Sequence, residues 1–275
     1  MDLHSGLPYW IIRNSLWDYF HPLEKDLSTD VVIVGSGITG ALMAHELCHA
    51  GIKCCIVDKR SIATGSSAAS TALLQYEIDV PLCRMAKIIG EENAATAYHA
   101  CLQSISDIKR VLEETGVNAG FEQLPSLFYA SSAADNKLLE QEHEIRQKHK
   151  LPVNLLEKKK IREEYKVKTP GNALINEASA QMDAYRAATG LLAYHIKESG
   201  LKVFTHTSIK ECIETSDGCI MTTDRGHKIK CGYVIIATGF EAGQFLPQKI
   251  MDLTSTYALV SHPVASEHLW PTHCL

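Results

Sequence analysis

Residues 30–60 read DVVIVGSGITGALMAHELCHAGIKCCIVDKR, and this stretch decides the fold of the chain. Its apolar start, Val31 to Val34, is typical of a strand that is buried on both faces of a parallel sheet. Good helix formers follow from Ile38 to Ala50, and a second apolar run, residues 53–57, ends at Asp58. The stretch therefore predicts a strand–helix–strand unit.

Three glycines stand between the first strand and the helix in the pattern G-x-G-x-x-G. Gly35 permits a tight turn, Gly37 lets the backbone approach a pyrophosphate, and Gly40 lets helix and strand pack closely. Asp58, at the end of the second strand, has the spacing that reaches a ribose hydroxyl. The pattern predicts a dinucleotide site but does not separate NAD from FAD, because both carry a pyrophosphate and an adenosine ribose.

The same helix contains H-E-x-x-H, the pattern of a zinc protease. His45 and His49 share one helix face, and Glu46 could act as a general base. The small apolar stripe that we expect on the sheet is formed by Ala41, Ala44, Leu47 and Cys48. This stripe would leave both histidines at the helix edge or in solvent, and no third ligand follows in a recognisable pattern. We therefore expect surface histidines and no metal site.

The remaining chain alternates helical and strand-like segments. We expect helices over residues 91–115 and 183–199, and one solvated amphipathic helix within the mixed charge run 136–168. Strand-like segments are 121–131, 201–206, 233–239 and 254–263, with two more on either side of the turn Ser216–Gly218.

Composition excludes several classes of function. The chain has 275 residues and a net charge of -5, which argues against nucleic acid as a partner. No signal peptide and no membrane span are recognisable. Nine cysteines with no C-x-x-C pair favour reduced, mostly buried thiols and a cytoplasmic location.

Beyond the glycine pattern, three further segments carry a family resemblance: ATGSSAASTALL (63–74), MDAYRAATGLL (182–192) and YVIIATGFEAG (233–243). With residues 30–60 they resemble the D-amino acid oxidase (DAO) family of FAD-dependent oxidoreductases, which includes glycine oxidase and γ-glutamylputrescine oxidase. The resemblance implies an α/β fold: a Rossmann-like FAD-binding domain with a parallel central sheet, and an α+β substrate domain.

The implied division of the chain has three parts: a lead-in over 1–27, an FAD-binding domain over 28–82 and 178–245, and a substrate domain over 83–177 and 246–275. Family members continue beyond the point where this sequence stops and supply a third flavin-binding segment there. We therefore expect an incomplete substrate domain and a fragmentary family member.

FAD is the cofactor that the resemblance implies, and it implies a set of residues around that cofactor. The set comprises Gly35, Ser36, Gly37, Ile38, Thr39, Gly40, Asp58, Lys59, Arg60, Gly65, Ser66, Ser67, Ala69, Ser70, Ile209, Ala237, Thr238 and Gly239. The alternative for the stretch around residues 65–70 is a flexible Ser/Ala linker.

The implied reaction is oxidation of a C–N bond. Hydride leaves the carbon of an amino acid or amine for the flavin, and water hydrolyses the resulting imine, while oxygen or another acceptor takes the electrons. Gln75 and Tyr76, with Glu77 beside them, are weak candidates for the border of the active site, and Tyr129 and Tyr257 are weaker. Two alternatives stay open: a flavin dehydrogenase of a hydroxy acid or glycerol phosphate, and an inactive fragment.

Overall fold

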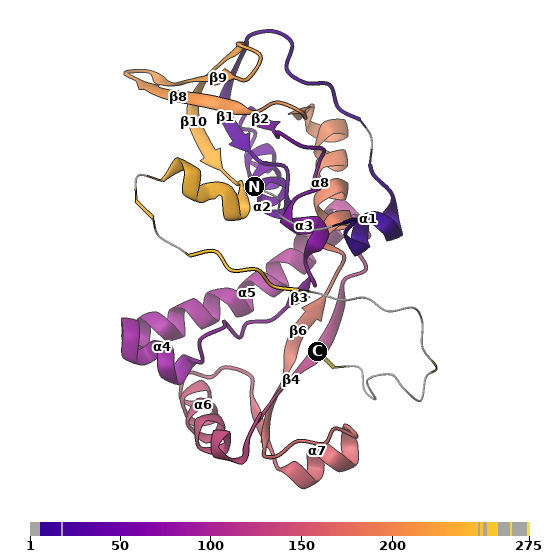
Figure 1. The fold of residues 1–275 in the computed structure, drawn as a ribbon, viewed down its shortest axis with the longest axis vertical. Coiled ribbons are helices and arrows are strands. Elements are labelled where there is room, and N and C mark those ends of the chain that lie inside the picture. The colour runs from indigo at the N-terminus through magenta and orange to yellow at the C-terminus, as the bar shows by residue number, and fades with distance from the viewer. Residues whose placement is uncertain (1–5, 18, 247, 250–251, 258–264, 266–273) are drawn as a thin grey trace. The chain divides into compact units, whose positions relative to one another are not determined.

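The computed structural model describes residues 6–17, 19–246, 248–249, 252–257, 265 and 274–275 (Figure 1). The chain forms two compact units. The first unit comprises Met1–Thr71, Leu112–Ala119 and Asp183–Val260, and the second comprises Ala72–Val111, Gly120–Met182 and Ser261–Leu275.

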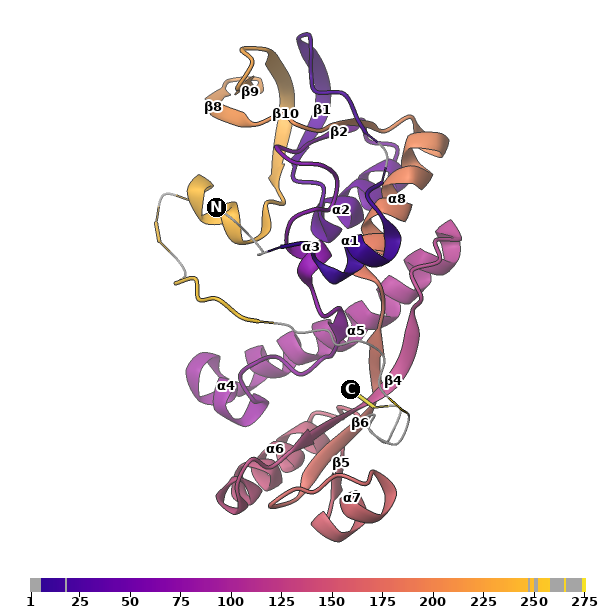
Figure 2. The ribbon, with the colours of Figure 1, turned by 45° about the vertical axis from the view of Figure 1, so that its right-hand side comes forward.

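A six-stranded sheet with the order β7-β2-β1-β10-β9-β8 forms the first unit. The strands are β1 (Leu27–Val34), β2 (Cys54–Val57), β7 (Lys202–Phe204), β8 (Ile209–Thr215), β9 (Gly218–Thr223) and β10 (Lys228–Ile236). The strands β7, β2, β1 and β10 run parallel to one another. The β8–β9 hairpin pairs with the edge of β10 in antiparallel orientation. Figure 2 shows this hairpin beside β10. The prediction of an α/β fold with a parallel central sheet is confirmed.

The centre of this sheet is β1, which explains its composition. Val32 and Ile33 are fully buried because β1 has a neighbouring strand on each side and is covered on both faces at these positions. The helix α2 (Ile38–His49) buries Gly40, Ala41, Ala44 and His45. The helix α8 (Ala184–Ser199) begins at the Asp183 cap, whose carboxylate accepts the Arg186 N–H at 2.9 Å, and ends at Gly200 in the left-handed conformation.

The N-terminal lead-in is fastened to the first unit through polar contacts. The helix α1 (Tyr9–Asn14) places the indole N–H of Trp10 2.7 Å from the carbonyl oxygen of Ser70, to which it donates. Asn14 donates to the Asp183 carboxylate at 2.6 Å, and the Leu23 N–H donates to the Thr207 hydroxyl at 3.0 Å. These contacts give the lead-in a structural role in the first unit.

In the second unit a small antiparallel sheet is centred on β6 (Ala173–Gln181). The strand β4 (Glu122–Tyr129) pairs with one edge of β6, and β3 (Leu73–Leu74) and β5 (Asn154–Leu156) pair with the other. The helices are α4 (Leu82–Ile89), α5 (Glu91–Thr115), α6 (Asn136–Lys148) and α7 (Lys158–Glu164). Short helices complete the chain: α3 (Ser66–Ala69) and η2 (Gly239–Phe245) in the first unit, and η1 (Ala133–Asp135) in the second.

The expectation of one solvated helix within residues 136–168 is wrong. Lys150 adopts a left-handed φ of 57° and Pro152 follows, so α6 ends before them and β5 separates it from α7. The inner face of α6 is not solvated either, because Glu142 and Arg146 are buried.

The boundaries of the two units differ in part from the expected domains. Residues 72–82 and 178–182 belong to the second unit, and residues 112–119 and 246–260 belong to the first. The expected strand at 254–263 lies largely outside the described residues, and residues 254–257 form none. The assignment of the units to cofactor and substrate binding stays a prediction.

All nine cysteines are free thiols, but only Cys54, Cys55, Cys83 and Cys231 are buried, so the expectation of mostly buried thiols holds in part. Within the described residues, no helix combines the length and apolar character that a membrane crossing requires.

Candidate cofactor site

A cavity of about 290 Å³ lies in the first unit at the carboxyl ends of β1, β2 and β10. This end of a parallel sheet, where the strand order turns from β2 to β10 around β1, is where open α/β folds bind ligands. The expected cofactor residues line it with three exceptions, Ser36, Gly40 and Ala69. Segments 35–39, 58–60, 65–70 and 237–239 thus meet around one space although they are far apart in sequence.

Two glycines of the turn are required by close backbone contacts. Gly35 has a φ of 110°, and a Cβ there would lie 2.4 Å from the carbonyl oxygen of Ala237. A Cβ at Gly40 would lie 2.0 Å from the carbonyl oxygen of Gly35. Gly40 therefore lets the helix approach the turn, and its absence from the cavity wall agrees with that packing role.

Gly37 lines the cavity as Gly35 does, but it differs from the other two because a Cβ there would meet no backbone atom. It is the N-terminal cap of α2 with extended backbone, φ -69° and ψ -174°, which any residue can adopt. A Cβ would meet only the Ser67 hydroxyl, at 3.0 Å. That hydroxyl accepts the Ile38 N–H at 2.9 Å, so α3 closes one side of the α2 N-terminus. The first-turn N–H groups have no acceptor within the helix and carry its positive end.

Asp58 organises the turn as well as facing the cavity. Its Oδ2 accepts the Ser36 N–H at 2.8 Å and the Ser36 hydroxyl at 2.6 Å, and its Oδ1 accepts the Arg60 N–H at 2.8 Å. A carboxylate offers about four acceptor positions, so Oδ1 keeps one for a ribose hydroxyl. Ser36 is fully buried and acts through Asp58, which explains why it does not line the cavity.

Glu241, which the sequence did not single out, lines the cavity between two cations. Its carboxylate accepts from Lys59 Nζ at 2.7 Å and from Arg60 Nη1 and Nη2 at 2.9 and 3.2 Å. Burial by itself would raise the pKa of Glu241, but the hydrogen bonds and charges of Arg60 and Lys59 outweigh it and lower the pKa to about 2. This pair orients the Arg60 guanidinium, which the sequence assigned to the cofactor.

Replacing Glu241 should change the acid stability of the first unit. The depressed pKa stabilises the fold above the ordinary value of 4.5, and this contribution is lost as the pH falls from 4.5 toward 2. We expect Glu241→Gln to lower the free energy of unfolding at pH 7 by about 1 to 3 kcal/mol, since both cations are partly solvated. Urea unfolding of both proteins at pH 7 and pH 3 measures this difference in the free energy of unfolding. An equal difference at both pH values would contradict the stabilising role of the Glu241 charge.

FAD fits the residues present, on two observations. Gly37 lines the cavity without a side chain, so a pyrophosphate there could approach the backbone of the turn. The Thr238 Oγ1 is buried in the cavity wall and has no hydrogen-bond partner among the described residues, which leaves it for a ligand. The linker alternative for residues 65–70 is also disfavoured, because residues 66–69 form α3 and Ser67 is buried.

The cavity wall also contains residues that sequence reasoning missed: Glu241, Ala63, Thr207, Gln244 and Phe245.

His45 is not on the surface, contrary to expectation. Its side chain is 4% exposed, and its Nδ1 lies 3.0 Å from Nε2 of His195 on α8, whereas His49 is exposed. The helix α8 covers His45, and the H-E-x-x-H motif gives no information about that helix. Within the described residues, Glu91, Glu92 and His149 form the one group with metal-ligand spacing, and neither His45 nor His49 belongs to it. In this group the Glu91 Oε1 atom lies 2.6 Å from His149 Nε2 and 2.6 Å from Lys148 Nζ.

The two weak catalytic candidates lie in the second unit and differ in exposure. Tyr76 is fully buried and donates its hydroxyl to the carbonyl oxygen of Pro152 at 2.7 Å; burial raises its pKa to about 12. This geometry favours packing over catalysis, since a buried phenol is withheld from substrate. Gln75 is exposed and donates to the Ser126 hydroxyl at 2.8 Å, and its place in an active site stays a prediction. Tyr129 and Tyr257 are exposed.

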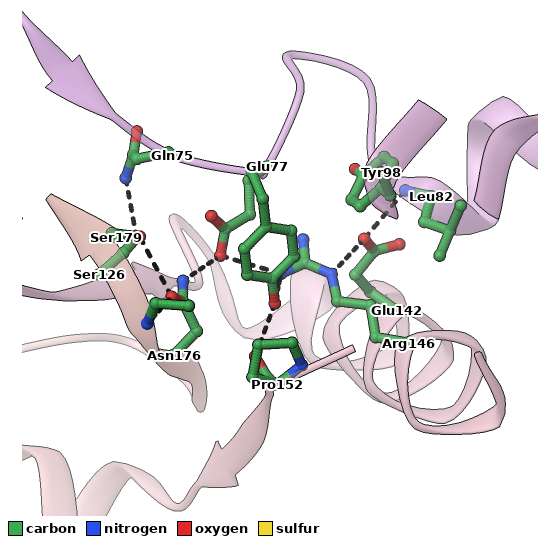
Figure 3. A network of polar contacts seen from close by, with 12 residues as sticks. Gln75, Glu77, Leu82, Tyr98, Ser126, Glu142, Arg146, Pro152, Asn176 and Ser179 are labelled. Carbon is green, nitrogen blue, oxygen red and sulfur yellow. Dashed lines mark hydrogen bonds and ion pairs between the residues drawn. The ribbon is translucent and has the colours of Figure 1, made fainter. Parts of the chain in front are cut away.

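Tyr76 contacts Arg146, which lies at the centre of a buried polar network. Figure 3 shows Arg146 with Glu77 and Glu142 of this network. Arg146 Nε donates to Glu142 at 2.7 Å, and its Nη1 donates to Glu77 at 3.1 Å. The guanidinium carbon lies 5.5 and 5.6 Å from the ring centres of Tyr76 and Tyr98. Glu142 also accepts the N–H groups of Leu82 and Cys83, so the network fixes the start of α4 to α6.

Comparison with known proteins identifies the family. The family model described as DAO, FAD dependent oxidoreductase, matches residues 30–274. YhfW of Bacillus subtilis (strain 168), which carries the name of a Rieske 2Fe-2S iron-sulfur protein, is 23% identical over 232 residues, covering 84% of this chain and 44% of that protein.

Solved structures share the fold. Glycine oxidase from Geobacillus kaustophilus superposes with a TM-score of 0.67 at 22% identity, over 79% of this chain and 57% of that one. L-α-glycerophosphate oxidase from Mycoplasma pneumoniae, solved with FAD bound, gives 0.64 at 20% identity, over 79% and 56%. The chain therefore spans about half the length of the proteins that it matches.

Proposed function

This chain belongs to the DAO family of FAD-dependent oxidoreductases, and on that premise we propose that its first unit binds FAD and that the whole protein oxidises the C–N bond of an amino acid or amine. The observation that carries the cofactor assignment is the cavity at the carboxyl ends of β1, β2 and β10, where the separate expected segments meet. The α2 N-terminus supports a pyrophosphate there, and Asp58 supports the ribose.

In this proposal the chain's residues bind and orient the cofactor. Bound FAD would supply the acceptor for the substrate hydride. The first-turn N–H groups of α2 other than that of Ile38, which donates to Ser67, and the Thr238 hydroxyl would donate to ligand oxygens. Arg60, held by Glu241, places a positive charge at the cavity wall. Gln75 directly follows β3. We propose it as a neighbour of the substrate and assign it no step in the reaction.

A second candidate is a flavin dehydrogenase acting on a hydroxy acid or glycerol phosphate. It is favoured by the L-α-glycerophosphate oxidase structure, whose TM-score is close to that of glycine oxidase. Amine substrates and hydroxylated substrates would both react with FAD bound at the same cofactor site, so the fold does not distinguish between the two classes. The electron acceptor is oxygen or another acceptor, and the name of YhfW favours an iron–sulfur centre as that other acceptor.

An anaerobic reduction assay separates the two donors. The FAD-loaded protein is mixed with panels of amino acids and amines, 2-hydroxy acids, and glycerol phosphate, and the visible flavin absorbance is followed. We expect bleaching by at least one amine substrate and none by the hydroxylated compounds. Bleaching by glycerol phosphate or a hydroxy acid alone would contradict the proposal and support the second candidate; dithionite serves as the control that the flavin is reducible.

A further inference from the structure

At the end of the first unit opposite to the cofactor cavity, two cysteine sulfurs lie side by side. Cys48 is in the last turn of α2, Cys54 is the first residue of β2, and their Sγ atoms are 3.8 Å apart. A disulfide needs about 2.05 Å, so a small movement would join them. The C-x-x-C pattern is absent because a helix end and a turn separate the pair in sequence.

The pair is accessible from solvent. Cys48 is partly exposed, and both cysteines line a cavity of about 640 Å³ at the base of α2 and α8. Charged side chains around this cavity are Lys53, Lys202 and Glu198. A small oxidant can therefore reach Cys48, the more exposed of the two, from this cavity, which the buried Cys54 also lines.

A line of polar side chains leads from the core to Cys48. The Ser199 hydroxyl is close enough to Cys48 to lower the pKa of that thiol. Ser199 Oγ is 3.1 Å from Nδ1 of His195, and Nε2 of His195 is 3.0 Å from Nδ1 of His45. With both imidazoles neutral and protonated on Nδ1, His45 donates to His195 and His195 donates to the Ser199 hydroxyl.

These contacts favour a thiolate at Cys48. The hydrogen bond from Cys54 lowers the pKa of Cys48, burial opposes this, and Ser199 lowers it further, so that the pKa falls from 9.0 to about 7. The same hydrogen bond, together with burial, raises the pKa of Cys54. Burial also lowers the pKa of His195, which keeps that imidazole neutral near pH 7. The pair therefore has an attacking sulfur and a protonated neighbour.

From this geometry we propose that Cys48 and Cys54 form a redox-active dithiol that hydroperoxides oxidise to an intramolecular disulfide. The Cys48 thiolate attacks the hydroperoxide, so an S–O bond forms, the O–O bond breaks, and the leaving oxygen takes a proton to give an alcohol or water. Cys54 then loses its proton and attacks the Cys48 sulfur, which forms the S–S bond and releases water. Two thiols are oxidised and one hydroperoxide is reduced. The site does not depend on the proposed FAD reaction.

Mass mapping after treatment with one equivalent of hydrogen peroxide tests the proposal. We expect the wild-type protein to lose two hydrogens and to yield a linked Cys48–Cys54 peptide. In Cys54→Ser, Cys48 should stop at the sulfenic acid and be labelled by dimedone, and Cys48→Ser should give neither product. Oxygen addition without a Cys48–Cys54 link in the wild type would overturn the proposal, and so would an unlabelled Cys48 in a folded Cys54→Ser or Cys54→Ala.

Alkylation rates provide a matched control and a test of the positioning role of Ser199. Cys212 is the control because its side chain is exposed while its pKa is raised, chiefly by the burial that remains. At pH 7 iodoacetamide should therefore modify Cys48 at least about fivefold faster than Cys212. Ser199→Ala should slow the Cys48 reaction at pH 7 but not at pH 10, and Ser199→Thr should restore it. A faster reaction at Cys212, or an equal effect of Ser199→Ala at both pH values, would contradict the proposed activation.

Discussion

Gly37→Val should abolish FAD binding while the protein stays folded. The extended backbone of Gly37 tolerates a side chain, and a Cβ meets only the Ser67 hydroxyl, at 3.0 Å. The valine methyl groups would occupy the space where we place the pyrophosphate. We expect the FAD dissociation constant to rise at least about 100-fold in a fluorescence titration, which corresponds to a loss of about 3 kcal/mol of binding free energy.

Gly40→Val is the matched control for this experiment. It carries the same change in the same turn, but its Cβ would lie 2.0 Å from the Gly35 carbonyl oxygen. We expect it to lower the thermal midpoint strongly, because backbone must move, whereas Gly37→Val should lower it only slightly. Equal FAD affinity in Gly37→Val and the wild type would contradict the placement of the pyrophosphate.

Arg146→Met should destabilise the second unit by about 3 to 5 kcal/mol, because it leaves the Glu142 carboxylate buried without its countercharge. Glu142 has no exposed side-chain surface, and Arg146 bridges it to Glu77. The loss also removes the guanidinium from the rings of Tyr76 and Tyr98. Urea unfolding, followed by circular dichroism, measures the change.

Arg110→Met provides the comparison for Arg146. Arg110 is half exposed and pairs with Asp107 at 3.6 Å across one helix turn. Such a pair contributes about 0 to 1 kcal/mol, so the variant should unfold near the wild-type midpoint. A similar loss in both variants would show that the Arg146 network does not stabilise the second unit more than an exposed ion pair does.

Much of the first unit could be predicted because its signals are local. The strand β1, the helix α2 and the strand β2 lie within residues 27–57, and the β-branched run, the glycine turn and the acid that follows β2 each have a local physical meaning. The cavity residues beyond them followed from the resemblance, since no local pattern relates residues 237–239 to residue 35.

Contacts between distant segments were not predictable in the same way. Glu241 gains its role only when η2, which follows β10, places it beside Lys59 and Arg60, and His45 is buried only because α8 covers it. The strand β6 escaped notice because ALINEASAQ has few β-branched residues, although six of its nine residues are buried. The charge balance in α6 suggested a solvated helix and concealed the buried pair of Glu142 and Arg146.

The most direct test of the account is the cofactor content of the purified protein. The protein is incubated with FAD, freed of excess ligand, and denatured, and the released nucleotide is identified and quantified by mass spectrometry. We predict a yellow protein that releases FAD at about one molecule per chain, with NAD absent, and a colourless but folded Gly37→Val. A folded wild-type protein that stays colourless, or one that retains NAD in place of FAD, would contradict the assignment of this cavity.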